Sequence, residues 1–212
     1  REKGEDFVLD DVEGLELDFD LDVTQDAELE IIINKETGHA LKGRGVGGLL
    51  VEINTNGKFD MWGDFSVFEG VYNFAYGGLV QKQFIVQPGG TVAWEGDPLK
   101  AQINMLATYK TQTNPSPLLD NPINRSIPVE LNITLNGDLE RPDPSFDFEF
   151  PNANSTIKSE LQYRLDSDAE KQNQALYFLA TGGSFQNRGS GTKDRSGTIA
   201  ERLNGIVNGI FT

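Results

Sequence analysis

The strictest constraint on the fold comes from an alternation of side-chain types near the start of the chain. The segment from Leu15 to Val23 reads LELDFDLDV, with an apolar residue at every odd position and an acidic residue at every even one. Successive side chains of a β-strand point to opposite faces, so this period predicts a strand with one apolar and one acidic face. Leu15, Leu17, Phe19 and Leu21 would share the apolar face, and the question is what covers it.

Similar segments follow along the chain. Further strands are predicted at AELEIIIN, LLVEIN, KFDMWGDFSVFEGVYNFAY, KQFIVQ, TVAWEGDP, AQINMLATYK, IPVELNITLNGDL and SFDFEF. They recur at roughly ten-residue spacing with short turns and no crossover helix, which indicates a largely antiparallel sheet with one apolar side. The run GRGVGG, from Gly43 to Gly48, is expected to be a glycine bend between two of these strands.

From Ser155 onward the period becomes that of a helix. Ile157, Leu161 and Leu165 lie on one helical stripe, and a second helix is expected to end at Gly182 and Gly183. The apolar stripe from Ile199 to Phe211 predicts a third helix. We therefore expect a sheet over residues 1–151 and a helical tail over residues 152–212, with a polar linker at 184–197.

Composition excludes several classes of function. The formal net charge of −15 argues against nucleic-acid binding, which needs clustered Lys and Arg. Without cysteine the chain has no disulfides and no thiolate metal sites. Its longest apolar run, from Ala175 to Ala180, is far shorter than the ~20 residues that span a bilayer. No signal-like segment is present at the start. We therefore interpret the sequence as a fragment and expect any membrane anchor to lie outside it.

Two apparent ligand motifs have simpler interpretations. Gly43, Gly45 and Gly48 fit the spacing G-x-G-x-x-G, but a strand follows them, whereas a dinucleotide site requires a helix there. Asp18, Asp20 and Asp22 alternate along a strand, so their carboxylates diverge and form a solvated acidic face rather than a calcium site.

Catalytic chemistry has little support in the sequence. The only histidine, His39, lies in a predicted polar turn, and without other histidines or cysteines neither zinc nor Ser–His chemistry is expected. A glycosidase-type carboxylate pair is the remaining enzymatic alternative, because Glu69, Glu95 and Asp97 lie near the tryptophans, Trp62 and Trp94. With 33 acidic residues in the chain, this proximity carries little information.

The apolar face must be covered, because fully burying one large apolar side chain contributes ~1.5–3 kcal/mol. Leaving the apolar side chains of two strands in water would cost about as much as the ~5–15 kcal/mol by which a typical domain is stable. The covering is the other half of the sheet, the amphipathic tail, or a ligand such as an acyl chain, which gains ~0.8 kcal/mol per buried CH₂. The residues alone favour a closed sandwich over an open trough, because most one-sided sheets close on themselves.

A family resemblance changes this balance. Between Gly43 and Lys110 the pieces GxFxMxGxF, EGxYxF, KxFxxxxGGxxxWxGDP and AxY occur in order, and IPVELNITLNGDLERPDPSFDFEFP and NQALYFLATGGSF follow. Together they resemble the C-terminal domain of the TamB family in its Bacteroidetes-like form, over about Leu15 to Phe185. The family is similar to AsmA-like, bridge-like lipid-transfer proteins.

The resemblance implies a mainly β fold, a long curled antiparallel sheet that forms an open U-shaped apolar trough (a "β-taco"), followed by a short helical tail. Gly57, Gly63, Gly70, Gly90 and Gly96 would permit the bends of this trough. The residues that would line it are Val51, Ile53, Phe59, Met61, Phe65, Val67, Ile103, Met105, Val129, Leu131 and Ile133.

The resemblance also implies a setting in the cell envelope. It implies a periplasmic location, an N-terminal inner-membrane helix in the full-length protein, and an Omp85-type outer-membrane barrel, TamA or BamA-like, as partner. It implies phospholipid as the ligand, and neither a catalytic residue nor a cofactor.

Two functional hypotheses follow. In the first, Leu17, Phe19 and Leu21 join a non-enzymatic groove that conducts phospholipid acyl chains between the inner and outer membranes. In the second, the chain is an assembly factor for outer-membrane or autotransporter proteins, whose sheet edge or groove receives unfolded strands by β-augmentation. The second hypothesis requires an unpaired edge strand, which the sequence does not identify.

Overall fold

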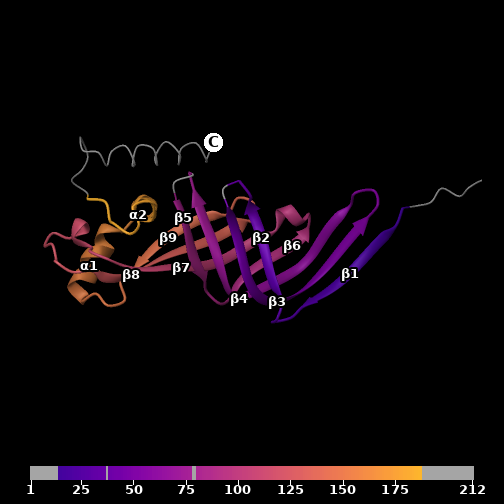
Figure 1. Ribbon diagram of the computed structural model, residues 1–212, viewed down its shortest axis with the longest axis horizontal. Helices are drawn as coiled ribbons and strands as arrows, with labels where there is room; N and C mark the ends of the chain where they lie inside the picture. The colour runs from indigo at the N-terminus through magenta and orange to yellow at the C-terminus, as the bar shows by residue number, and fades with distance from the viewer. Residues whose placement is uncertain (1–13, 37, 78–79, 188–212) are drawn as a thin grey trace, which may run out of the picture.

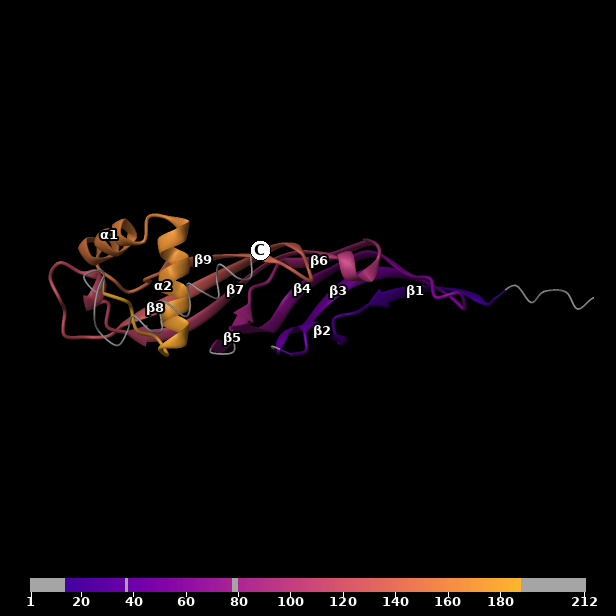
Figure 2. The ribbon, with the colours of Figure 1, turned by 90° about the horizontal axis from the view of Figure 1, so that it is seen from above.

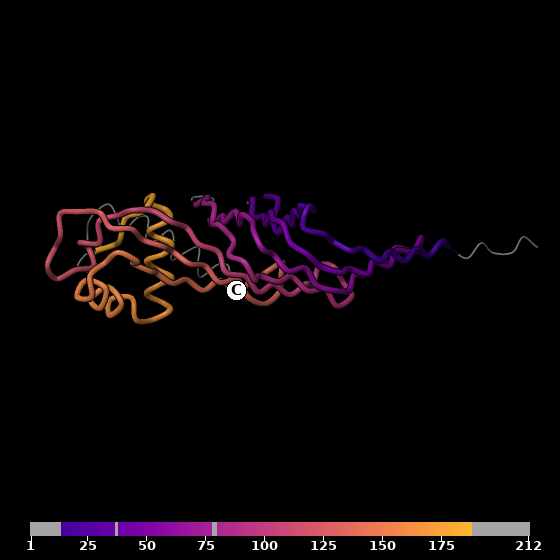
Figure 3. Tube along the Cα trace, turned by 90° about the horizontal axis from the view of Figure 1, so that it is seen from below, coloured from indigo at the N-terminus to yellow at the C-terminus, as the bar shows by residue number. Residues whose placement is uncertain are grey.

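A computed structural model describes residues 14–36, 38–77 and 80–187 as one antiparallel sheet followed by two helices (Figure 1). The molecule is elongated, with both helices near one end and β1 at the other (Figures 1 and 3). The strands are β1 (Glu16–Val23), β2 (Glu28–Asn34), β3 (His39–Asn54), β4 (Phe59–Tyr76), β5 (Val80–Val86), β6 (Gly90–Gly96), β7 (Gln102–Thr113), β8 (Ile127–Asp138) and β9 (Asp143–Glu149), and the helices are α1 (Ser155–Arg164) and α2 (Asp168–Ala180).

The strands do not simply follow one another across the sheet. The path is β1-β3-β4-β5-β7-β8-β9, while β2 also pairs with β3, and β6 with β4 and β7. β1 and β2 pair with opposite halves of β3, so they lie end to end along it. In the same way β5 and β6 lie end to end between β4 and β7. β1 and β2 therefore form one edge of the sheet and β9 forms the other.

The mainly β class, the antiparallel sheet and the start of a helical tail are confirmed. The two separate sheets of a sandwich are not present among the described residues, because all nine described strands belong to a single sheet. That sheet curls, since Phe74 of β4 contacts Phe146 of β9 at a ring-centroid distance of 5.9 Å, although three strands separate β4 from β9. An open U-shaped trough along the whole length stays a prediction.

The run from Gly43 to Gly48 is not the predicted bend, because it lies in the middle of β3. Its glycines allow β3 to approach β4 closely. A Cβ at Gly45 would lie 2.1 Å from the carbonyl oxygen of Ser66 and 2.7 Å from the ring of Phe65. Because these glycines lack side chains, β3 and β4 can pair closely here. The sequence analysis predicts instead that the glycine run interrupts a strand.

A β-bulge changes the phase of β4 near its middle. Gly45 pairs with Val67, but the preceding Arg44 pairs with Glu69, so Phe68 is an extra residue on β4. Before the bulge the odd-numbered residues of β4 face the core, and after it Tyr72 and the other even-numbered residues do. The bulge keeps the apolar residues of both halves on one face.

The two helices begin at side-chain caps and pack at one end of the sheet. Asn154 accepts a hydrogen bond from the backbone of Ile157 at 2.9 Å, and Ser167 caps α2. α2 packs against β9 and β5 (Figure 2). Positive φ at Gly182 and Gly183 ends the helix as predicted. No described helix has the length and hydropathy needed to cross a membrane.

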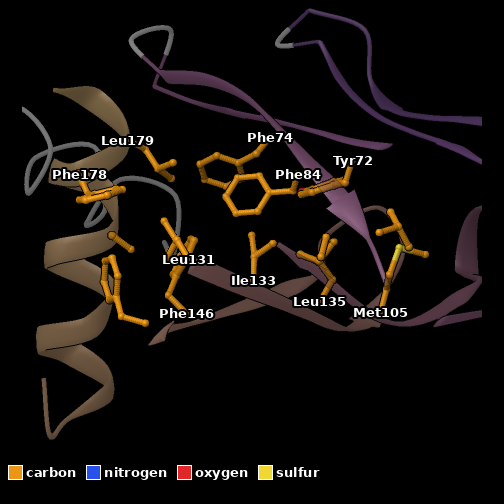
Figure 4. Close-up of a cluster of buried hydrophobic side chains, with 14 of the residues drawn as sticks. Tyr72, Phe74, Phe84, Met105, Leu131, Ile133, Leu135, Phe146, Phe178 and Leu179 are labelled. Atoms are coloured by element: carbon orange, nitrogen blue, oxygen red, sulfur yellow. The ribbon is translucent and has the colours of Figure 1, made fainter. Parts of the chain in front are cut away.

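Aromatic side chains close this end of the sheet. Phe178 of α2, Phe185 beyond it and Phe148 of β9 lie with ring centroids 5.0–5.5 Å apart. Figure 4 shows the neighbouring core, where Phe74 and Phe84 point toward Leu131 and Ile133 of β8. Residues 188–197 of the predicted linker and the stripe from Ile199 to Phe211 lie outside the described residues.

Candidate binding site on the apolar face

The strand register joins the predicted apolar residues into one face. Directly opposed residues of antiparallel strands point to the same side of a sheet. Phe19 of β1 lies opposite Val51 of β3, which lies opposite Met61 of β4, and the neighbouring row consists of Leu17, Ile53 and Phe59. β1, β3 and β4 thus contribute apolar side chains to the same rows.

The same face continues to the other edge. Phe65 lies opposite Val92 of β6, and Val92 lies opposite Ile103 of β7. Met105 of β7 then faces the same side as the inward residues of β8. All the residues predicted within strands to line the trough therefore lie on one face; they are Leu17, Phe19, Leu21, Val51, Ile53, Phe59, Met61, Phe65, Val67, Ile103, Met105, Val129, Leu131 and Ile133.

Burial divides this face into two regions. Toward the helices the side chains form a filled core and are at most 2% exposed; they are Phe65, Val67, Ile103, Met105, Val129, Leu131 and Ile133. Val51 is buried and Met61 half-buried at the boundary. Beyond it lies what we call the open face, whose members are 38–60% exposed in the described part of the chain: Leu15, Leu17, Phe19, Leu21, Ile53 and Phe59.

The opposite side of the same strands is acidic and solvated, as predicted. Asp18 lies opposite Glu52, which lies opposite Asp60. Lys58 reaches these carboxylates, at 2.5 Å from Glu52 and 3.7 Å from Asp60. The hydrogen bond that Lys58 donates to Glu52 raises the pKa of the Lys58 ammonium. Among the described residues no acidic or histidine cluster could hold a metal ion.

Glu69 and Glu95, two of the carboxylates considered for glycoside hydrolysis, lie too far apart to form a pair. Glu69 lies opposite Arg44, whereas Glu95 lies opposite Trp62, seven positions away along β4. At ~3.3 Å per residue that separation is about 23 Å, well beyond the ~5–10 Å of a glycosidase pair. The side chain of Asp97 accepts a hydrogen bond from the backbone of Leu99 and caps a short 3₁₀ turn.

A second feature, which the sequence did not indicate, is a cavity of about 970 Å³ between β4, the β8–β9 turn and α2. His39 lines it and is not in a polar turn, since it begins β3 and its ring lies 5.9 Å from that of Tyr72. Burial lowers the pKa of His39 and raises the pKa of Tyr72 and Tyr76. Local sequence gives no signal for this cavity, because its walls come from segments far apart in the chain.

The comparisons with known proteins complete the description of the site. A family model described as the TamB C-terminal domain matches residues 3–211, nearly the whole chain. The comparisons with curated proteins and with solved structures give no match.

Proposed function

Because the chain belongs to the TamB C-terminal domain family, we propose that it conducts phospholipid acyl chains along the apolar face of its sheet. The family is associated with the cell envelope. Membership of this family is consistent with a role in outer-membrane assembly. The proposed role is non-enzymatic, because acyl chains would be held by burial alone.

The open face carries this proposal. Its six large apolar side chains remain substantially exposed, while the acidic residues of the same strands all face the other side. An acyl chain lying on the open face would gain ~0.8 kcal/mol per buried CH₂, so about ten methylenes would match the burial of several core side chains. An exposed apolar surface beside a polar rim is typical of an interaction site.

Continuity with the core supports movement along the face. Phe19 and Val51 lie in the same row, and Val51 already borders the filled region. A lipid entering at β1 would therefore meet apolar side chains as far as Phe65, where the chain's own core begins. In the proposed setting, between the inner and outer membranes, the acidic side would remain in water.

Native mass spectrometry of the gently purified chain, with organic extraction of what dissociates, tests the proposal. We expect co-purifying phospholipid with the unaltered chain and its loss in the variant carrying Leu17→Asp and Phe19→Asp. The matched control carries Val46→Asp and Leu50→Asp, because these side chains are 41% and 39% exposed on the opposite side of β3. Equal loss of lipid in both folded variants, or a lipid-free unaltered chain, would contradict the proposal.

A second function, strand capture during outer-membrane assembly, is favoured by the edge of the sheet. β1 pairs only with β3 among the described residues, so one side of its backbone has no partner strand there. Such an edge accepts an extended segment by β-augmentation. An unfolded outer-membrane protein, or the Omp85-type barrel proposed as partner, would supply that segment.

Hydrogen exchange distinguishes the two functions. Strand capture predicts that the backbone amides of Glu16 to Val23 that point away from β3 become protected against exchange when an unfolded outer-membrane protein is added. Lipid binding covers the side chains of the open face, so it predicts no new protection of these amides against exchange. Unchanged amide exchange in the presence of a bound client would exclude capture at β1.

A further inference from the structure

The two edges of the sheet differ in how far their backbones are protected from a further strand. β9 contains Pro144, which has no N–H to donate, and α2 packs against this strand. The side chain of Lys171 on α2 forms an ion pair with Asp147 of β9 at 2.9 Å. Proline, lysine and a covering helix are common means of preventing strand pairing at an edge. The β9 edge is therefore protected.

The opposite edge is divided between β2 and β1. The register of β2 shifts between Ile32 and Asn34, and its Glu28 forms an ion pair with Lys42 at 2.9 Å. β1, in contrast, pairs with β3 over eight consecutive residues without a shift. β1 contains neither proline nor lysine, and among the described strands it pairs with β3 alone. β1 is thus the regular and unprotected part of this edge.

β1 presents two rows of side chains beside its free backbone. Its three members of the open face form the apolar row and are 41–44% exposed. The other row consists of three exposed aspartates, Asp18, Asp20 and Asp22. No Lys or Arg in the described part of the chain forms an ion pair with these aspartates. The free side of β1 is therefore apolar on one face and negatively charged on the other.

The neighbouring strand does not neutralise this charge. The β3 residues opposite the three aspartates are Glu52, Leu50 and Gly48, and none of them is a cation. Lys58 pairs with Glu52 and with Asp60 of β4 instead. A strand added on the free side of β1 would place its own side chains directly opposite the aspartates. Cross-strand pairs of opposite charge stabilise a sheet, and pairs of like charge destabilise it.

We propose that the free side of β1 selects an extended polypeptide segment whose residues alternate between apolar and basic. Opposed residues of paired strands point to the same face, so the apolar side chains of the segment extend the open face and its Lys or Arg side chains lie opposite the aspartates. A second copy of β1 does not fit, because it would bring further aspartates to this edge. Such selection rests on the strand capture proposed above and adds the class of segment that is captured.

Three synthetic peptides test this selection on the full chain by hydrogen exchange. Each has eight residues, the length of β1, and blocked ends, and valine alternates in it with lysine, threonine or glutamate. We expect the lysine peptide to protect alternate backbone amides of β1 at concentrations roughly tenfold lower than the threonine peptide requires. The glutamate peptide should give no protection at these concentrations. An ionic strength of about 1 M, where the Debye length is ~3 Å, should remove most of the difference between the lysine and threonine peptides.

A triple variant with Asp18→Asn, Asp20→Asn and Asp22→Asn keeps the shape of the row and removes its charge. In this variant we expect the lysine and threonine peptides to protect β1 equally. The matched control changes the net charge by the same amount at three exposed carboxylates outside β1, through Glu95→Gln, Glu140→Gln and Asp166→Asn. The control should keep the preference for lysine.

The possible failures can be told apart. Equal protection of β1 by the three peptides, or a lysine preference that survives in the asparagine variant, would overturn charge selection and leave strand capture standing. If none of the peptides protects β1, strand capture at this edge fails as well. Lipid conduction is decided separately, by the native mass spectra of the chain without peptide.

Discussion

Two alanine substitutions on the same face of the sheet give the sharpest test of how that face is divided. Leu131 is fully buried opposite Tyr109 and Phe148. Leu131→Ala removes its side chain from an enclosed position and is expected to cost about 2–5 kcal/mol, which includes the cavity left behind. Phe19, in contrast, is 42% exposed on an edge strand.

The expected cost of Phe19→Ala follows from its exposure. Full burial of such a side chain contributes ~1.5–3 kcal/mol. With 58% of its surface covered, the change should cost about 0.9–1.7 kcal/mol, and no enclosed cavity forms at the edge.

Urea unfolding followed by circular dichroism measures both free energies. The two variants are expected to keep the slope of the unaltered chain, so a shift in midpoint reports stability. In thermal unfolding each kcal/mol should lower the midpoint by about 2–4 °C for a chain of this length. If Phe19→Ala destabilises as much as Leu131→Ala, the open face is covered in solution and the reasoning from exposure fails.

Three further results are expected. Gly45→Ala should destabilise by about 1–3 kcal/mol in urea unfolding, because its Cβ meets the Ser66 carbonyl. Gly48→Ala, whose Cβ meets nothing within 4 Å, should change stability by less than about 0.5 kcal/mol; equal effects would contradict the close approach of β3 and β4. Asn154→Ala should cost about 0.5–2 kcal/mol by removing the cap of α1, whereas Ser159→Ala at an exposed position of the same helix should not destabilise, as thermal unfolding can check. Burial lowers the pKa of His39 below 6.5, so the unfolded chain binds the proton first as pH falls. The free energy of unfolding should therefore decrease from pH 6.5 down to the pKa of His39 in the folded chain. His39→Gln should remove this part of the pH dependence, which urea unfolding at several pH values measures.

The strands were predictable because their alternation is local. The face shared by Leu17 and Phe19 follows from the pleat alone, and the end of α2 follows from Gly182 and Gly183. The run from Gly43 to Gly48 was misinterpreted because glycine marks both bends and close approaches of two backbones. Only the position of β4 distinguishes the two cases.

The exposure of the open face and the cavity at His39 could not be predicted, because both depend on contacts between distant segments. Phe65 and Phe19 look alike in the sequence, yet one is buried and the other exposed. The difference depends on where the sheet curls and where α2 packs. His39 was assigned to a turn because no local pattern places it beside Phe74, its neighbour across β3 and β4.

The bulge at Phe68 has a consequence for how this sequence can evolve. Deleting Phe68 would restore a regular ladder and keep Tyr72 and Phe74 on the core face, because Glu69 would then follow Val67 in the normal alternation. A one-residue insertion or deletion elsewhere in the strand would instead rotate one half of β4, so that its apolar side chains would point to water. A two-residue change would preserve the parity of both halves. Away from the bulge, insertions and deletions tolerated within β4 should therefore occur in even numbers, whereas the loss of the single residue Phe68 should be tolerated.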